Sequence, residues 1–133
     1  MTVRSKMHGV TLIELLTVIV VVSILAAIAV PSYRSYLIRS QRTDATAALL
    51  RLAANQEKFY LQNNTYTDDE SKVGGAVSEH GWYAIEITAA DANSFNAKAT
   101  VVAGGAQAND SHCTSFSINE VGKRDATNTD CWR

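Results

Sequence analysis

The chain has 133 residues, a mass of 14.4 kDa and a formal net charge of −1. This length leaves room for one domain and one appended element, which excludes a multidomain enzyme. Residues 32–59 carry five basic and two acidic side chains, whereas residues 60–133 carry five basic and ten acidic ones. The acidic C-terminal half speaks against a broad nucleic-acid-binding surface, which needs clustered positive charge.

The first predicted element is an apolar segment from Val10 to Val30, in which Glu14 is the one ionisable residue. As an α-helix it would be about 30 Å long, which matches the hydrocarbon thickness of a bilayer. Arg4 and Lys6 precede it and favour a cytoplasmic N-terminus. Three arginines beyond the segment oppose that orientation, so charge alone does not decide it.

Glu14 limits what this segment can be. A cleaved secretory signal, with Ala27 to Ala29 as its cleavage site, has a shorter apolar core and no carboxylate inside it. A simple membrane anchor would explain the length, but a carboxylate in hydrocarbon costs about 2.5 to 3.5 kcal/mol at the centre. An intramembrane carboxylate is therefore expected to have a function, and snorkelling to the membrane interface is the alternative.

The stretch from Lys6 to Glu14, followed by the apolar run and Pro31, resembles the class III prepilin leader of type IV pilins and type II secretion pseudopilins. The resemblance implies that a prepilin peptidase cuts between Gly9 and Val10, removes residues 1–9 and leaves Val10 to be N-methylated. It also implies that Glu14 acts in subunit assembly. Val10 departs from the phenylalanine that is usual at this place in the family.

Elementary electrostatics fits that role for Glu14. Cleavage would leave a free amine on Val10, and the Glu14 carboxylate could pair with the amine of a neighbouring subunit. In a low-dielectric setting such a pair is strong when both charges are matched, whereas an unpaired buried charge is costly. The pair would therefore fix the register between subunits.

We predict one long helix from Thr11 to Gln62 with a kink at Pro31, where a helical hydrogen bond is lost. Residues 10–31 would span the membrane and later form filament core, and residues 32–62 would be amphipathic. The residues expected to face a core recur at three- and four-residue steps: Ala45, Ala48, Leu49, Leu52, Gln56, Phe59 and Tyr60.

Residues 63–133 are predicted to form a small head of β-structure. Alternating apolar residues indicate strands over Trp82–Thr88, Ser94–Val102 and Thr114–Asn119, and Gly122 allows a tight return into a fourth. Consecutive turns favour an antiparallel meander. The expected class is therefore α+β, with a long N-terminal helix packed against about four strands.

Two further residue groups bear on chemistry. Cys113 and Cys131 suit a single disulfide in an exported head, and two separate buried thiols are the alternative. With His112 they offer at most three zinc ligands and no CxxC pair. The run Asp68-Asp69-Glu70 offers three side chains where calcium takes about six to eight oxygens, so we interpret it as a solvated acidic loop. We expect no metal and no cofactor.

Residues 32–66 and 118–132 also resemble the PilE-like minor pilins of Gram-negative type IV pili. The resemblance implies the type IV pilin fold and a disulfide between Cys113 and Cys131 that closes a C-terminal loop. It implies assembly with other minor and major pilins by inner-membrane pilus machinery, in an initiation or tip complex that supports pilus biogenesis, adhesion and twitching motility. The precursor would sit in the inner membrane with a periplasmic head before it enters the extracellular pilus.

Other functional classes receive less support. After cleavage the chain keeps only His80 and His112 and has no GxSxG, HExxH or glycine-rich phosphate loop, so we expect no enzyme. A DNA-receptor minor pilin for natural transformation is an alternative, with Lys123, Arg124 and Arg133 as candidate DNA contacts. A type II secretion pseudopilin is another, although major pseudopilins generally lack the cysteine pair.

Overall fold

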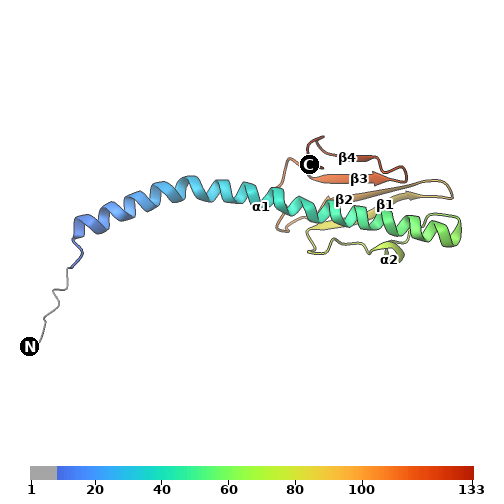
Figure 1. Ribbon diagram of the computed structural model, residues 1–133, viewed down its shortest axis with the longest axis horizontal. Coiled ribbons are helices and arrows are strands. Elements are labelled where there is room, and N and C mark those ends of the chain that lie inside the picture. Colours follow the sequence, from blue (N-terminus) through green and yellow to red (C-terminus); the bar gives the residue numbers. More distant parts are fainter. Residues whose placement is uncertain (1–8) are drawn as a thin grey trace, which may run out of the picture. The chain divides into compact units, whose positions relative to one another are not determined.

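The computed structural model describes residues 9–133, which form two helices and four strands (Figure 1). The elements are α1 (Leu12–Asn63), α2 (Glu70–Val73), β1 (Tyr83–Ala90), β2 (Phe95–Val101), β3 (Ser115–Asn119) and β4 (Arg124–Ala126). The chain divides into two compact units, of which the first extends to Leu37 and the second runs from Ile38 to Arg133. The predicted α+β class is confirmed.

The first unit consists of the N-terminal part of α1. The helix begins directly after Thr11. The Thr11 hydroxyl accepts the N–H of Glu14 at 3.3 Å, and the Thr11 carbonyl accepts the N–H of Leu15 at 3.1 Å. This is the N-cap arrangement that threonine favours. The helix continues through Pro31 without a break. The predicted bounds are confirmed to within one residue, and the kink at Pro31 stays a prediction.

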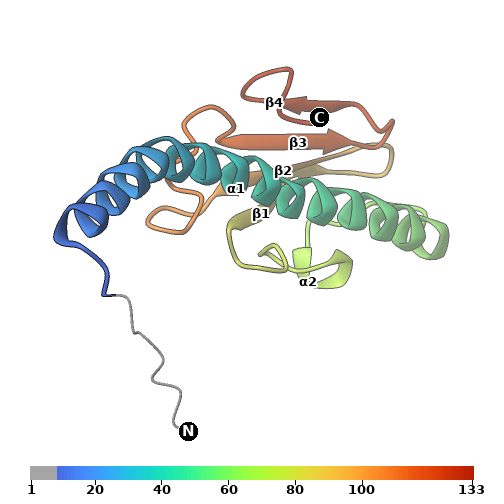
Figure 2. The same cartoon turned by 60° about the vertical axis from the view of Figure 1, so that its left-hand side comes forward.

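The second unit begins with the amphipathic part of α1, which lies along one face of the sheet (Figure 2). Ala45, Leu49 and Leu52 are buried at the predicted spacing. Gln56 is also buried, and its amide donates to the carbonyl of Thr67 at 2.6 Å and accepts the N–H of Thr67 at 3.0 Å. The buried amide is thereby satisfied, as burial of a polar group requires.

The helix ends where the chain turns left-handed. Asn64 has φ 54°, and its N–H donates to the carbonyl of Tyr60 at 2.8 Å. Asparagine tolerates this conformation better than most residues with a Cβ atom, so the pair Asn63-Asn64 stops the helix as predicted.

The four strands form an antiparallel meander in the order β1-β2-β3-β4, as predicted. Successive residues of a strand point to opposite faces, so every second residue lies on the helix side of the sheet. Ile85 pairs with Ala99, which pairs with Phe116, and all three are buried. Together with the other buried residues of the sheet and the buried face of α1, they form the core of the head.

The segment before β1 differs from the prediction. Asp69 and Glu70 were expected in a solvated loop, but Asp69 caps α2 by accepting the N–H of Ser71 at 3.0 Å. The Glu70 carboxylate accepts the N–H of Ile87 on the outer edge of β1 at 3.1 Å. A partly buried backbone N–H at the edge of a sheet needs a hydrogen-bond acceptor, which explains why the Glu70 carboxylate is held against β1. Asp69 and Glu70, two of the three side chains that could have bound calcium, are therefore engaged in structural contacts.

Candidate functional site

The residues predicted to act in processing lie just before α1. Residues 1–8 of the predicted leader, with Arg4 and Lys6, fall outside the described residues. Gly9 and Val10 are exposed, and a Cβ atom added at Gly9 would meet no atom within 4 Å. The fold therefore has no steric need for a glycine at this position, and a requirement for glycine would have to come from outside the fold.

Glu14 occupies the first turn of α1, where a negative charge is favoured by the helix dipole. Its backbone is engaged, because its N–H donates to Thr11 and its carbonyl accepts the Thr17 hydroxyl at 2.8 Å. Among residues 9–133, no hydrogen bond or ion pair engages its carboxylate. The carboxylate is thus available to a partner outside the chain.

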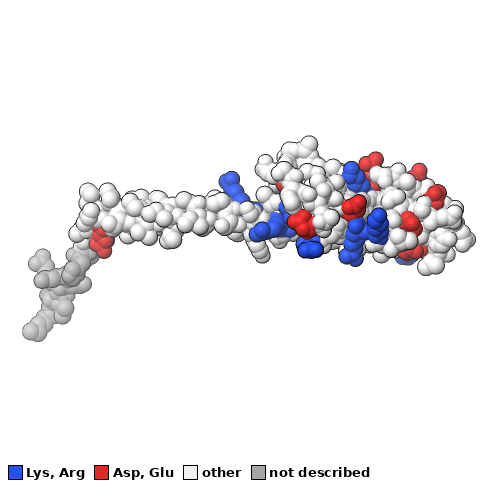
Figure 3. Space-filling model, turned by 90° about the horizontal axis from the view of Figure 1, so that it is seen from above, with Lys and Arg blue, Asp and Glu red and all other residues white. Residues whose placement is uncertain are grey.

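The apolar stretch that follows Glu14 packs against no other element among residues 9–37. Every large apolar side chain from Leu12 to Val30 is exposed. On the face shown in Figure 3, this stretch is uncharged between an acidic N-terminal end and the first basic side chain. In the described part of the chain, α1 is the one helix whose length and composition would allow it to cross a membrane.

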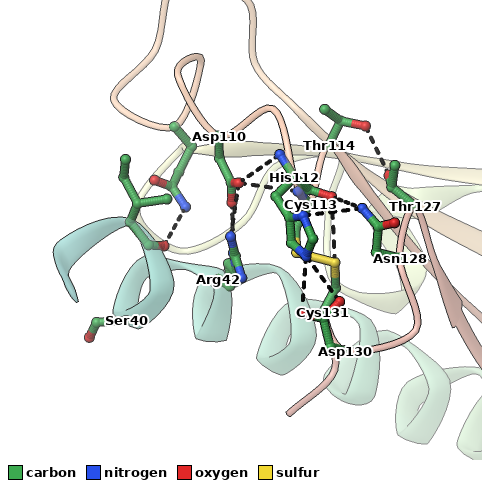
Figure 4. A network of polar contacts seen from close by, with 12 residues as sticks. Ser40, Arg42, Asp110, His112, Cys113, Thr114, Thr127, Asn128, Asp130 and Cys131 are labelled. Atoms are coloured by element: carbon green, nitrogen blue, oxygen red, sulfur yellow. Dashed lines mark hydrogen bonds and ion pairs between the residues drawn. A yellow bond between two sulfur atoms is a disulfide. The ribbon is translucent and has the colours of Figure 1, made fainter. Parts of the chain in front are cut away.

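The head holds a buried ion pair that sequence reasoning did not find. Asp110, with only 2% of its side chain exposed, accepts bonds from the Nε and Nη2 atoms of Arg42 at 2.7 and 3.0 Å. It also accepts the backbone N–H groups of His112 and Cys113 at 3.2 and 3.1 Å (Figure 4). Burial alone would raise the pKa of Asp110, but these four bonds outweigh it and the pKa is lowered.

The disulfide between Cys113 and Cys131 closes the C-terminal loop, as the family resemblance implied. Beside it, Asn128 donates to the carbonyl of His112 at 2.6 Å, and His112 Nε2 lies 3.0 Å from Asp130 (Figure 4). Both sulfur atoms are bonded to each other, so the trio of His112, Cys113 and Cys131 offers a metal only the imidazole.

The three candidate DNA contacts are exposed, and one of them meets an aromatic ring that the sequence did not single out. The Arg124 guanidinium lies 5.3 Å from the centre of the Trp132 ring. Trp132 donates its indole N–H to the carbonyl of Asp125 at 2.7 Å, which fixes the ring. Arg133 follows Trp132 in the chain, and Lys123 precedes Arg124 in the turn before β4.

A second buried carboxylate, Asp44 on α1, also escaped sequence reasoning. Its Oδ1 atom lies 3.0 Å from Nδ1 of His80, whose ring stacks on Trp82 at 4.6 Å. Burial would raise the pKa of Asp44, but hydrogen bonds from Ser78 and His80 lower it. Helical spacing places Asp44 on the buried face of α1, eight residues before Leu52, but no sequence pattern links it to His80, which lies 36 residues further along the chain.

Known protein families match both units of the chain. The prokaryotic N-terminal methylation motif matches residues 4–30. The type IV minor pilin ComP, described as a DNA uptake sequence receptor, matches residues 31–117, more than half of the chain. The chain belongs to the type IV pilin family.

Individual relatives agree with this assignment. The type IV major pilin PilA of Myxococcus xanthus is 34% identical to this pilin over 87 residues, which cover 65% of this chain and 40% of that protein. The fimbrial protein EcpC of Eikenella corrodens is 36% identical over 113 residues, covering 78% of this chain and 71% of that one. This pilin therefore aligns with less than half the length of the Myxococcus protein.

A solved structure has the same fold. The crystal structure of the Neisseria meningitidis non-core minor pilin PilV matches with a TM-score of 0.59 at 20% identity, covering 72% of this chain and 92% of that one. At this identity the match supports the fold alone. Type IV pilins are structural subunits that assemble with other pilins, and the exposed apolar half of α1 fits a membrane-anchored pilus subunit.

Proposed function

We propose that this pilin is a minor subunit of a type IV pilus. In this proposal a prepilin peptidase removes residues 1–9, Val10 is N-methylated, and α1 holds the subunit in the inner membrane with the head in the periplasm. The assembly machinery then moves the subunit into the filament with other minor and major pilins. A place in the initiation or tip complex would let it support pilus biogenesis, adhesion and twitching motility.

The observation that carries the proposal is the Glu14 carboxylate, which has no partner among residues 9–133 and begins an exposed apolar helix. In the filament that helix is buried among its neighbours, and a bare carboxylate there would cost several kcal/mol. A free amine on Val10 of an adjacent subunit removes this cost. Assembly without the amine, or without the carboxylate, leaves one charge unmatched.

Two variants separate processing from assembly. Glu14→Gln keeps the shape of the side chain and should be cleaved normally but be lost from sheared pili. Ser23→Ala is the matched control, because its hydroxyl already bonds the carbonyl of Ile19 within the helix and should not matter for assembly. Normal recovery of Glu14→Gln in pili would refute the proposed role of the carboxylate.

Gly9→Val tests the cleavage site. Because no atom lies near a Cβ at Gly9, the variant should fold normally, and a block in processing can be assigned to the peptidase. Mass measurement of membrane-extracted protein should show the intact precursor for Gly9→Val and an N-terminus at Val10 for the wild type. A wild-type N-terminus after Ala29 would overturn the proposal in favour of a secretory signal.

A role as a DNA receptor in natural transformation is the second candidate, supported by the match to the ComP family over residues 31–117. Lys123, Arg124 and Arg133 lie outside that matched segment. Arginine stacked on tryptophan, as in Arg124 and Trp132, is a surface that can bind phosphate and stack on a base. A type II secretion pseudopilin is a third candidate, because its leader has the same pattern. The pilin relatives support this candidate less than the other two.

The soluble head, residues 34–133, is suited to a DNA-binding test because the whole core lies between Ala45 and Cys131. If the head binds DNA, retention in a gel shift should weaken as salt rises, and Arg124→Gln should bind less. Arg51→Gln is the control, because Arg51 already pairs with Glu79. No retention at low salt would end this candidate.

A further inference from the structure

A shallow groove of about 540 Å³ lies on the first unit, at the C-terminal boundary of the apolar stretch. Helical spacing brings its five lining residues onto one face of α1, because each of them lies three or four residues from another member of the set. They are Ala29, Val30, Tyr33, Arg34 and Leu37. Four of the five are apolar or aromatic, and Arg34 is the one charged residue among them.

The groove lies at the depth where a membrane changes from hydrocarbon to headgroups. Residues 15–33 contain no charged side chain. The run from Val10 to Val30 would extend for about 30 Å as a helix, the thickness of the hydrocarbon layer. In the membrane-held subunit, Tyr33 and Arg34 would therefore lie in the interfacial layer, where tyrosine is enriched and where a long arginine side chain can reach the headgroups.

Arg34 has a free charge at this place. Its side chain is exposed, and it makes no hydrogen bond or ion pair with any residue from 9 to 37, the described part of its own unit. A guanidinium binds a phosphate with two parallel hydrogen bonds, which few other side chains can do. Arg42 presents the contrast, because Asp110 already engages its guanidinium.

We propose that this groove binds a membrane phospholipid, whose phosphate pairs with Arg34 while Tyr33 and Val30, which lie on the membrane side of Arg34, contact the glycerol and the upper acyl carbons. The groove is shallow and open, so it would contact one side of the lipid near its phosphate and would not enclose the molecule. The inference rests on the membrane-anchored state in the proposed function. The lipid would hold the subunit at a fixed depth and would have to leave when the helix enters the filament.

The test uses the full chain in nanodiscs that contain equal parts of phosphatidylglycerol and phosphatidylcholine, transferred to mild detergent and analysed by native mass spectrometry. The wild type should retain one phospholipid per chain. Arg34→Gln should reduce the retained fraction about tenfold, because two charge-assisted hydrogen bonds are lost. Arg34→Lys should give an intermediate value, since lysine keeps the charge but not the paired geometry.

Arg39→Gln is the matched control, because it removes the same charge five residues further along and does not line the groove. Tyr33→Ala should reduce retention and Tyr36→Ala should not, although both tyrosines are about equally exposed, at 63% and 62%. Equal loss with Arg34→Gln and Arg39→Gln would show general charge attraction and overturn the site. A lipid-free dimer of this chain would also overturn it, because a second copy would then occupy the groove.

The same experiment distinguishes failure of this inference from failure of the proposed function. If the chain does not enter nanodiscs, the membrane-held state is wrong and the lipid site is wrong with it. If the chain enters nanodiscs normally but retains lipid independently of Arg34, only the lipid site is wrong. Circular dichroism of each variant should show the helix content of the wild type, since all four substituted side chains are exposed on α1.

Discussion

Removal of the Arg42 side chain should destabilise the head more than any other change of a charged residue on α1. In Arg42→Ala, the Asp110 carboxylate stays buried and keeps only the two N–H groups of His112 and Cys113. Breaking a buried ion pair from one side costs about 3 to 5 kcal/mol. Because 14% of the Arg42 side chain is exposed, we expect the lower end, about 3 kcal/mol.

The measurement is urea and thermal unfolding of the soluble head, residues 34–133, with Arg51→Ala as the control. Arg51 pairs with Glu79, but the two side chains are 58% and 67% exposed, so the control should lose less than about 1 kcal/mol. For a domain of this size, a loss of about 3 kcal/mol lowers the melting temperature by roughly 12 to 24 °C. A double variant, Arg42→Ala with Asp110→Asn, removes the orphaned charge and should be no less stable than Arg42→Ala.

Two results would refute this reasoning. If Arg42→Ala and Arg51→Ala are destabilised equally, the pair with Asp110 does not carry the predicted energy. If the double variant is less stable than Arg42→Ala, the Asp110 carboxylate still stabilises the head without Arg42, and the cost does not come from an unmatched charge.

Three further predictions concern the head. Replacing Cys113 and Cys131 by serine should cost roughly 3 kcal/mol of unfolding free energy, because the cross-link closes a loop with a sequence separation of 18. Leu49→Ala should cost about 2 to 5 kcal/mol, whereas Leu50→Ala, at a 41% exposed position, should cost little; equal losses would contradict the core assignment. The pKa values of Asp44 and Asp110 are lowered in the fold, so their stabilisation is present above the unfolded value near 3.8 and lost as the pH falls through the folded values. Unfolding free energy measured from pH 7 to pH 2.5 should therefore fall below about pH 4, and Asp110→Asn should flatten that fall.

The sequence alone determined the elements whose signal is local. The bounds of α1 and the faces of β1 to β3 follow from helical and strand periodicity, because burial on one side imposes that period on the residues. Tyr83, Ile85 and Ile87 alternate in the sequence and are buried in the fold. Glu14 was also evident, because a carboxylate within an uncharged run stands out without any structure.

Only the tertiary structure decided which polar residues form ion pairs and hydrogen bonds in the head. Arg42 and Asp110 lie 68 residues apart, and Asp44 and His80 lie 36 apart, so no local pattern links them. The same holds for Glu70, which was expected in solvent and instead binds the edge of β1. Periodicity reports where apolar surface is buried, whereas an ion pair depends on where the folded chain brings distant charges together. That difference separates Arg42, which is engaged in the head, from Arg34, which has no ion-pair partner among residues 9–37 and which we propose binds a phosphate.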